Sequence, residues 1–158
     1  MVQALAFLVV LTLALVNGEA VLKLGEFQPL SNGVAGEIHA ETDKILVIKN
    51  FMYDGKAPDA YFYAGTSGNP SSNGFLLEYP PGSTAPLGAF DGSQGDITFE
   101  LPGNIKVTDL AWISVWCEDL AIDFGNMYFD QEAIGEAEPN AEGGGEPEGE
   151  AEVEGGLD

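Results

Sequence analysis

The sequence predicts an all-β fold, an antiparallel β-sandwich of the immunoglobulin or DOMON kind, followed by a disordered acidic tail. Short runs rich in Val, Ile, Phe, Tyr and Trp alternate with turn-forming clusters, and no long helical period appears. Glycine contributes 21 of the 158 residues, which is roughly twice its average share of about 7%. Around eight short strands at such spacing are typical of a sandwich.

The first element in chain order is an apolar run from Ala4 to Val16, followed by the small residues Gly18 and Ala20. A run of this length is too short to cross a bilayer, which needs about 20 residues, and it fits the apolar region of a signal peptide. We therefore expect a signal peptide over residues 1–20. Because no second apolar run follows, the mature protein is predicted to be secreted, extracellular and not inserted in a membrane.

The central segment, residues 21–130, is predicted to form the β-domain. The expected strands, in order, cover residues 36–41, 44–50, 60–65, 74–79, 96–101, 111–117, 121–125 and 127–129. The breaks between them carry turn chemistry, as in Asp54-Gly55 and Pro80-Pro81-Gly82. Four consecutive apolar residues inside 44–50 predict a central strand that is covered on both faces.

The last segment, residues 131–158, contains ten acidic residues, no basic residue and no aromatic one. Such a composition cannot bury enough apolar surface to offset the entropy of ordering, so we expect disorder from Gln131 onward. Its closely spaced carboxylates could bind calcium weakly or coat a cationic surface, or could simply keep the chain soluble. The candidate calcium ligands are Glu146, Glu148, Glu150, Glu152 and Glu154.

The charge of the chain excludes whole classes of partner. Asp and Glu number 26 against five basic residues, which are all lysines, and the formal net charge is −21. A chain of this charge repels a phosphate backbone and an anionic lipid surface. We therefore expect neither nucleic-acid binding nor docking to anionic membranes.

One combination of motifs makes residues 25–129 resemble the DM13 domain family. The matching residues are Val34-x-Gly36, Asn50 to Gly55, Ala57 to Phe62, Leu101-Pro102, Ile113 to Cys117 and Asp123 to Gly125. The resemblance implies a secreted or cell-surface domain with a redox or electron-transfer role exercised through its cysteine. It also implies a DOMON or cytochrome-type redox partner, because proteins with this domain often carry such a domain beside it.

Cys117 is the candidate redox residue that the resemblance implies, either as a free thiol or as a ligand of haem or a redox metal. The residues themselves leave three interpretations open: a buried structural thiol, a redox or ligand thiol, and an intermolecular disulfide. Strand alternation directs Cys117 to the same face as Ile113 and Val115. We nevertheless expect it to be partly buried at a strand end, where aromatic residues line it: Trp116, Phe124 or Tyr128.

A haem or metal centre at Cys117 would need further ligands. The weak candidates are His39, which is the only histidine, and Met52, because imidazole and thioether suit a soft copper or haem site. The alternative is that His39 is an ordinary strand residue. No motif with zinc-ligand or c-type haem spacing occurs.

Two function classes follow from these observations. The first is a secreted redox or electron-transfer accessory module that acts through Cys117 and is not an enzyme on its own. The second is an acidic extracellular-matrix or calcium-associated binding protein without redox activity, in which the sandwich is a docking module.

Overall fold

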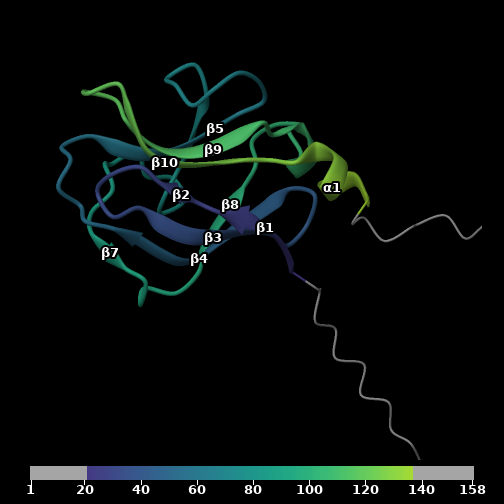
Figure 1. Ribbon diagram of the computed structural model, residues 1–158, viewed down its shortest axis with the longest axis horizontal. Coiled ribbons are helices and arrows are strands. Elements are labelled where there is room, and N and C mark those ends of the chain that lie inside the picture. Colours follow the sequence, from purple (N-terminus) through teal and green to yellow (C-terminus); the bar gives the residue numbers. More distant parts are fainter. Residues whose placement is uncertain (1–20, 137–158) are drawn as a thin grey trace, which may run out of the picture.

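The two antiparallel sheets of the protein pack face to face in the computed structural model, which describes residues 21–136 (Figure 1). The first sheet contains β1 (Leu22–Glu26), β3 (Ala35–Ala40), β4 (Ile45–Tyr53) and β7 (Phe90–Asp91) in that order, and β8 (Ile97–Glu100) also pairs with β4. The second sheet runs β2 (Gln28–Pro29), β10 (Ile122–Tyr128), β9 (Trp112–Cys117), β5 (Ala60–Gly65) and β6 (Phe75–Leu77). The prediction of an all-β antiparallel sandwich is confirmed.

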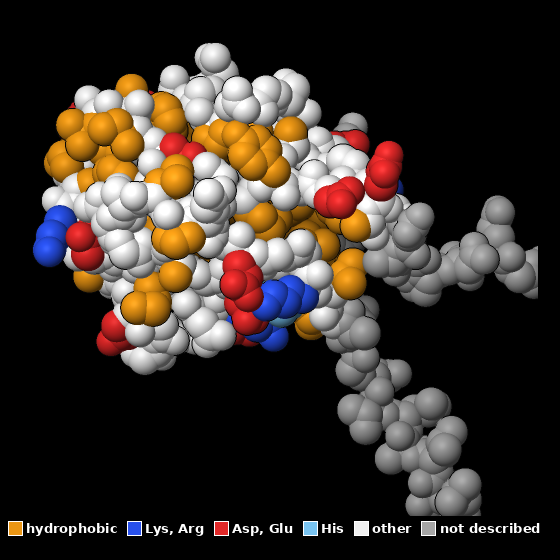
Figure 2. Space-filling view, viewed as in Figure 1, with side chains coloured by type: hydrophobic (Ala, Val, Ile, Leu, Met, Phe, Trp, Pro, Cys, Tyr) orange, Lys and Arg blue, Asp and Glu red, His pale blue; other side chains and the backbone are white. Residues whose placement is uncertain are grey.

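The expected signal peptide and the expected calcium ligands, Glu146 to Glu154, lie outside the described residues. Within residues 21–136, no helix is long and apolar enough to cross a membrane. The one 3₁₀ helix in this range is η1 (Val107–Asp109). On the face shown in Figure 2, charged side chains stand in small separate groups among uncharged surface.

The strand predicted for residues 44–50 is central, as its apolar run indicates. β4 pairs with β3 along one edge and with β8 and β7 along the other. Leu46, Val47 and Ile48 are all buried although their side chains alternate between the two faces of the sheet. The prediction that this strand is covered on both faces is therefore confirmed.

The two strands predicted over residues 121–125 and 127–129 are a single strand, β10. A bulge between Asp123 and Gly125 shifts the register against β9 without ending the pairing. The Asp123 carboxylate accepts a hydrogen bond from the Gly125 amide at 3.0 Å, which holds the bulge. A Cβ on Gly125 would clash with Val34, so this glycine permits close packing of two segments and does not mark a turn.

Order also extends beyond the predicted end of the domain. Residues Gln131–Glu136 form the short helix α1, contrary to the expectation of disorder from Gln131 onward. The Asp130 carboxylate caps the helix by accepting hydrogen bonds from the amides of Glu132 and Ala133. Ile134 is buried against the core, and the Gln131 side chain donates to the carbonyl of Leu110. One apolar residue and one cap are therefore enough to dock an otherwise acidic segment.

Candidate functional site

Cys117 is the last residue of β9, at the strand end where the sequence places it, but it is not at the rim. Its exposed fraction is 0%, and it belongs to the continuous hydrophobic core with Ile113 and Val115. β5 and β10 flank it, with Ala60 and Ile122 directly opposite. The expectation of a partly buried sulfur is therefore wrong, because strand alternation continues to the final residue and directs the side chain between the sheets.

The chain closes over this end of β9 through the turn that follows it. The amide of Glu118 donates to the carbonyl of Asp59 at 2.9 Å, which ties the turn to the start of β5. The backbone then reverses through Ala121, whose φ is +51°, into β10. This turn and the opposite sheet together seal Cys117 from solvent.

The aromatic environment of Cys117 differs from the expected one. Phe124 lies in the core and stacks on Tyr53, with ring centroids 6.3 Å apart. Tyr53 is 1% exposed, and burial, chiefly, raises the pKa of its phenol, with Asp54 and Cys117 adding to the rise. Trp116 lies on the other face of the sheet, and Tyr128 is 52% exposed at the far end of β10. Of the three expected aromatic residues, only Phe124 shares the interior with the sulfur.

The residues near Cys117 do not fit a haem or a metal centre. Such a centre needs a sulfur that faces open space and further ligands on the same side. His39 and Met52 lie on the outer face of the opposite sheet, because their neighbours Ile38 and Phe51 point into the core. Among residues 21–136, no group of three or more His, Cys, Asp and Glu side chains could hold a metal ion.

His39 and Met52 are also distant from each other. His39 pairs with Val47 and Met52 lies five residues further along β4, which corresponds to about 16 Å at the rise of a strand. The His39 imidazole contacts the Glu37 carboxylate at 3.1 Å, and Glu37 also pairs with Lys23 at 3.0 Å. Met52 is 47% exposed. His39 is therefore best described by the alternative interpretation, as an ordinary strand residue. Its imidazole contacts the carboxylate of the neighbouring Glu37.

We expect the Cys117 thiol to resist labelling in the folded protein and to react with iodoacetamide only after unfolding. Replacing Cys117 with serine places a hydroxyl in an apolar interior, which costs about 1–3 kcal/mol in the free energy of unfolding. Mass spectrometry of labelled protein with and without urea checks the first expectation, and urea titration checks the second. Fast labelling of the folded protein would show that the sulfur is accessible.

The outer face of the same sheet carries a second cluster, which the sequence analysis did not identify. Tyr61 and Tyr63 project from β5 on the side opposite to the core residue Phe62. The hydroxyl of Tyr61 donates to the carboxylate of Asp59, and that of Tyr63 donates to the carboxylate of Glu118. The available signals were the closeness of Asp59 to Tyr61 and the alternation of tyrosines in β5, whereas Glu118 is 55 residues away from Tyr63 in the chain.

These two tyrosines are expected to ionise at unusually high pH. The hydrogen bond to Asp59 raises the pKa of Tyr61 to about 12, and burial followed by the Glu118 carboxylate raises that of Tyr63 to about 12. Since the folded pKa exceeds the unfolded value of 10, the neutral phenols stabilise the folded state fully below pH 10. This contribution is lost as the pH rises towards 12.

The absorbance of tyrosinate, followed against pH, measures this directly. We expect Tyr61→Phe and Tyr63→Phe each to remove one of the late ionisation steps, while Tyr128→Phe leaves both in place. Ionisation of Tyr61 and Tyr63 near the ordinary value would show that the carboxylate contacts do not form in solution.

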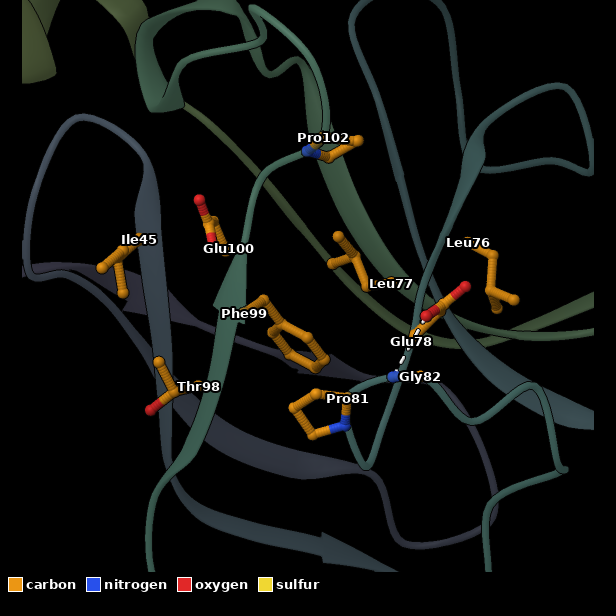
Figure 3. A pocket seen from close by; sticks show the side chains of 10 residues that line it. All are labelled: Ile45, Leu76, Leu77, Glu78, Pro81, Gly82, Thr98, Phe99, Glu100 and Pro102. Atoms are coloured by element: carbon orange, nitrogen blue, oxygen red, sulfur yellow. Dashed lines mark hydrogen bonds between the residues drawn. The ribbon is translucent and has the colours of Figure 1, made fainter.

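A cleft opens at the side of the sandwich between the edge strands β6 and β8, as Figure 3 shows. Its volume is about 550 Å³, and its walls are largely apolar, with Leu77, Phe99 and Pro81 among them. Glu78 lines it and accepts a hydrogen bond from the amide of Gly82 at 3.1 Å. Cys117 is not among the residues that line this cleft, so the cleft gives no access to the sulfur.

The fold and the site together define a small β-sandwich module with a single sealed thiol and a tyrosine–carboxylate cluster on one outer face. The chain belongs to the DM13 family, because the family model described as "Electron transfer DM13" matches residues 26–129. The family resemblance seen in the sequence is thereby confirmed.

Two relatives from Drosophila melanogaster match the chain over 106 residues. They are the Skeletor protein in its isoforms B/C and in its isoforms D/E, each 39% identical over 106 residues. The match covers 66% of this chain but only 13% and 7% of the two relatives. The chain therefore corresponds to a small part of each. No solved structure matches the chain.

Proposed function

We propose that this protein is an extracellular electron-transfer accessory module in which the Cys117 thiol is the redox group. Membership in the electron-transfer DM13 family supports the general role. The observation that carries the assignment to sulfur is that the single cysteine of the chain, Cys117, lies within residues 26–129, which the family model matches.

The burial of Cys117 limits the redox reactions that its sulfur can undergo. Disulfide exchange and direct ligation both need contact between the sulfur and a partner atom, and a side chain with no exposed surface offers none. Single-electron exchange does not need such contact. In the oxidising step, the Cys117 thiol gives one electron to a strong one-electron oxidant outside the domain, and its proton passes to solvent when the turn after β9 opens transiently. Return of one electron and one proton restores the thiol.

The partner that we propose is an extracellular or cell-surface redox protein of the DOMON or cytochrome type. Leu120 and Ile122, on the turn and strand next to Cys117, are 53% and 46% exposed, and they give this end of the sheet an apolar surface for contact. Intact-mass analysis tests the proposed location: protein from the culture medium should begin near Glu19 or Val21. A secreted chain that still begins at Met1, or a chain retained in the cell, would contradict it.

The redox assignment is tested by electron paramagnetic resonance of full-length protein frozen after oxidation by photogenerated ruthenium(III) tris(bipyridine). We expect a sulfur-centred radical signal in wild-type protein and none in Cys117→Ala. Thermal melts of both proteins serve as the control for folding. Identical spectra from the two folded proteins would overturn the role of Cys117.

A further inference from the structure

The two tyrosines of the cluster lie on β5, the strand that pairs with β9, which holds Cys117. In the pairing of β5 with β9, Tyr61 lies opposite Trp116 and Tyr63 lies opposite Ser114. Residues paired in this way share one face of a sheet, so the three aromatic side chains form one outer patch. Trp116 is also the residue immediately before Cys117, although its side chain is on the other face of the sheet.

Each tyrosine of this patch has a base at its hydroxyl. Asp59 accepts from Tyr61 and Glu118 accepts from Tyr63, and the 2.9 Å backbone hydrogen bond from Glu118 to Asp59 holds the two carboxylate-bearing segments together. A carboxylate that already accepts the phenolic hydrogen bond can take up the proton without any movement of the side chain.

Two other tyrosine hydroxyls, those of Tyr128 and Tyr53, have different partners. The Tyr128 hydroxyl donates to the side-chain oxygen of Asn69 at 3.0 Å, and an amide is a poor base. The Tyr53 hydroxyl accepts a hydrogen bond from the amide of Ala57 at 3.2 Å. Within residues 21–136, a hydrogen bond between a tyrosine hydroxyl and a carboxylate therefore occurs only at Tyr61 and Tyr63.

Trp116 provides the third oxidisable ring of the patch. Its exposed fraction is 8%, and its indole nitrogen is buried without a hydrogen-bond partner. A buried polar group without a partner is uncommon in native structures and calls for an explanation. This oxidisable indole lies directly opposite Tyr61 of β5 and belongs to the residue before Cys117 at the end of β9.

We propose that Tyr61 and Tyr63 form a proton-coupled redox site at which electrons leave the domain. The proposal rests on the electron-transfer role proposed above and identifies its point of contact with the oxidant. The oxidant is a strong one-electron acceptor, an oxidised metal complex that approaches the outer face of the sheet. One electron leaves the phenol for that acceptor, while the phenolic proton moves to Asp59 or Glu118.

The reverse transfer restores the phenol. An electron supplied by the domain reduces the phenoxyl radical, and the carboxylic acid returns its proton to the phenol oxygen. The phenol and the carboxylate are both regenerated, because the proton returns to the oxygen that it left. In this scheme the Cys117 thiol supplies the electron and releases its proton to solvent, which leaves a sulfur radical next to Trp116. One electron from a reduced redox partner and one proton from solvent restore the thiol.

Transient absorption of the full-length protein after photogeneration of ruthenium(III) tris(bipyridine) tests the site. We expect tyrosyl radical to form rapidly in wild-type protein and in Tyr128→Phe, and far less of it to form when Tyr61 and Tyr63 are both replaced by phenylalanine. Glu118→Gln and Asp59→Asn keep an acceptor for the hydroxyl but remove the base. Each should slow the oxidation of its own tyrosine, on the order of a hundredfold.

The outcomes separate this proposal from the role of Cys117. Suppose that tyrosyl radical forms in Cys117→Ala at the wild-type rate and that wild-type protein shows no sulfur radical. The tyrosine site would then stand, and only the redox role of the Cys117 thiol would be rejected. Equal tyrosyl yields in wild-type protein and in the double phenylalanine variant would overturn the tyrosine site. The phenylalanine variants keep both rings, so they decide the question even if a carboxamide variant fails to fold.

Discussion

Replacing Trp112 with alanine is expected to lower the free energy of unfolding by about 3–5 kcal/mol, which is among the largest effects of any single substitution. The side chain is 1% exposed, yet it lies on the outer face of its sheet and outside the main core. The loop after β5 covers it, and its indole N–H donates to the carbonyl of Ser67 at 3.0 Å. Alanine would lose this burial and leave the loop without a support.

The matched control is Tyr128, which pairs with Trp112 across β9 and β10 but is 52% exposed. We expect Tyr128→Ala to change the stability by only about 0.5 kcal/mol. Urea titration of the three proteins measures both effects. A loss below about 1 kcal/mol for Trp112→Ala would show that the loop does not pack on the indole in solution.

A double-mutant cycle tests the same contact from the opposite side. A Cβ at Gly65 would overlap the Trp112 ring, so Gly65→Ala alone should be strongly destabilising. In a Trp112→Leu background the ring is absent, and most of that loss should disappear. Strict additivity of the two substitutions would contradict the described packing.

Phe51→Ala is expected to have an effect of the same size, about 3–5 kcal/mol. Phe51 is 2% exposed, and its ring centroid lies 4.8 Å from that of Phe62 and 5.1 Å from that of Phe90. Because Phe62 belongs to the opposite sheet, this ring joins the two layers of the sandwich. Its loss would leave a cavity between them.

The control is Met52→Ala, one residue further along β4 and on the outer face of the same sheet. We expect this substitution to cost only about 0.5 kcal/mol and to leave the redox behaviour unchanged. Thermal and urea unfolding of the two variants measure the difference. Equal losses of stability in Phe51→Ala and Met52→Ala would mean that Phe51 does not point into the core and Met52 does not point outward.

Local sequence patterns predicted much of the fold. They succeeded for strands whose own residues show an apolar run or an alternation of apolar and polar residues. The prediction for residues 60–65 coincides with β5, and alternation in β9 correctly directs Ile113 and Val115 inward. Strands without such a signal were missed: β1, β2 and β7 were not predicted. The pairing of β2 and β7 with longer strands, and not their own composition, places them in the sheets.

The site was harder to predict because distant segments assemble it. The sequence identified Cys117 and its position at a strand end, but Tyr53 and Phe124 reach its surroundings from other strands. Tyr53 and Tyr61 are only eight residues apart in the sequence, but the fold separates them, because Tyr53 points into the core and Tyr61 points outward. Glu118 meets Tyr63 only through the pairing of β5 with β9.

The measurement that tests the central claim most directly is the lifetime of the tyrosyl and tryptophan radicals after flash oxidation, compared between wild-type protein and Cys117→Ala. If Cys117 is the redox group of the domain, its thiol supplies an electron to the oxidised aromatic residues. The radicals should then decay distinctly faster in wild-type protein than in the alanine variant, while the thiol remains closed to iodoacetamide in the folded protein. Equal lifetimes in the two proteins, at equal thermal stability, would contradict the account.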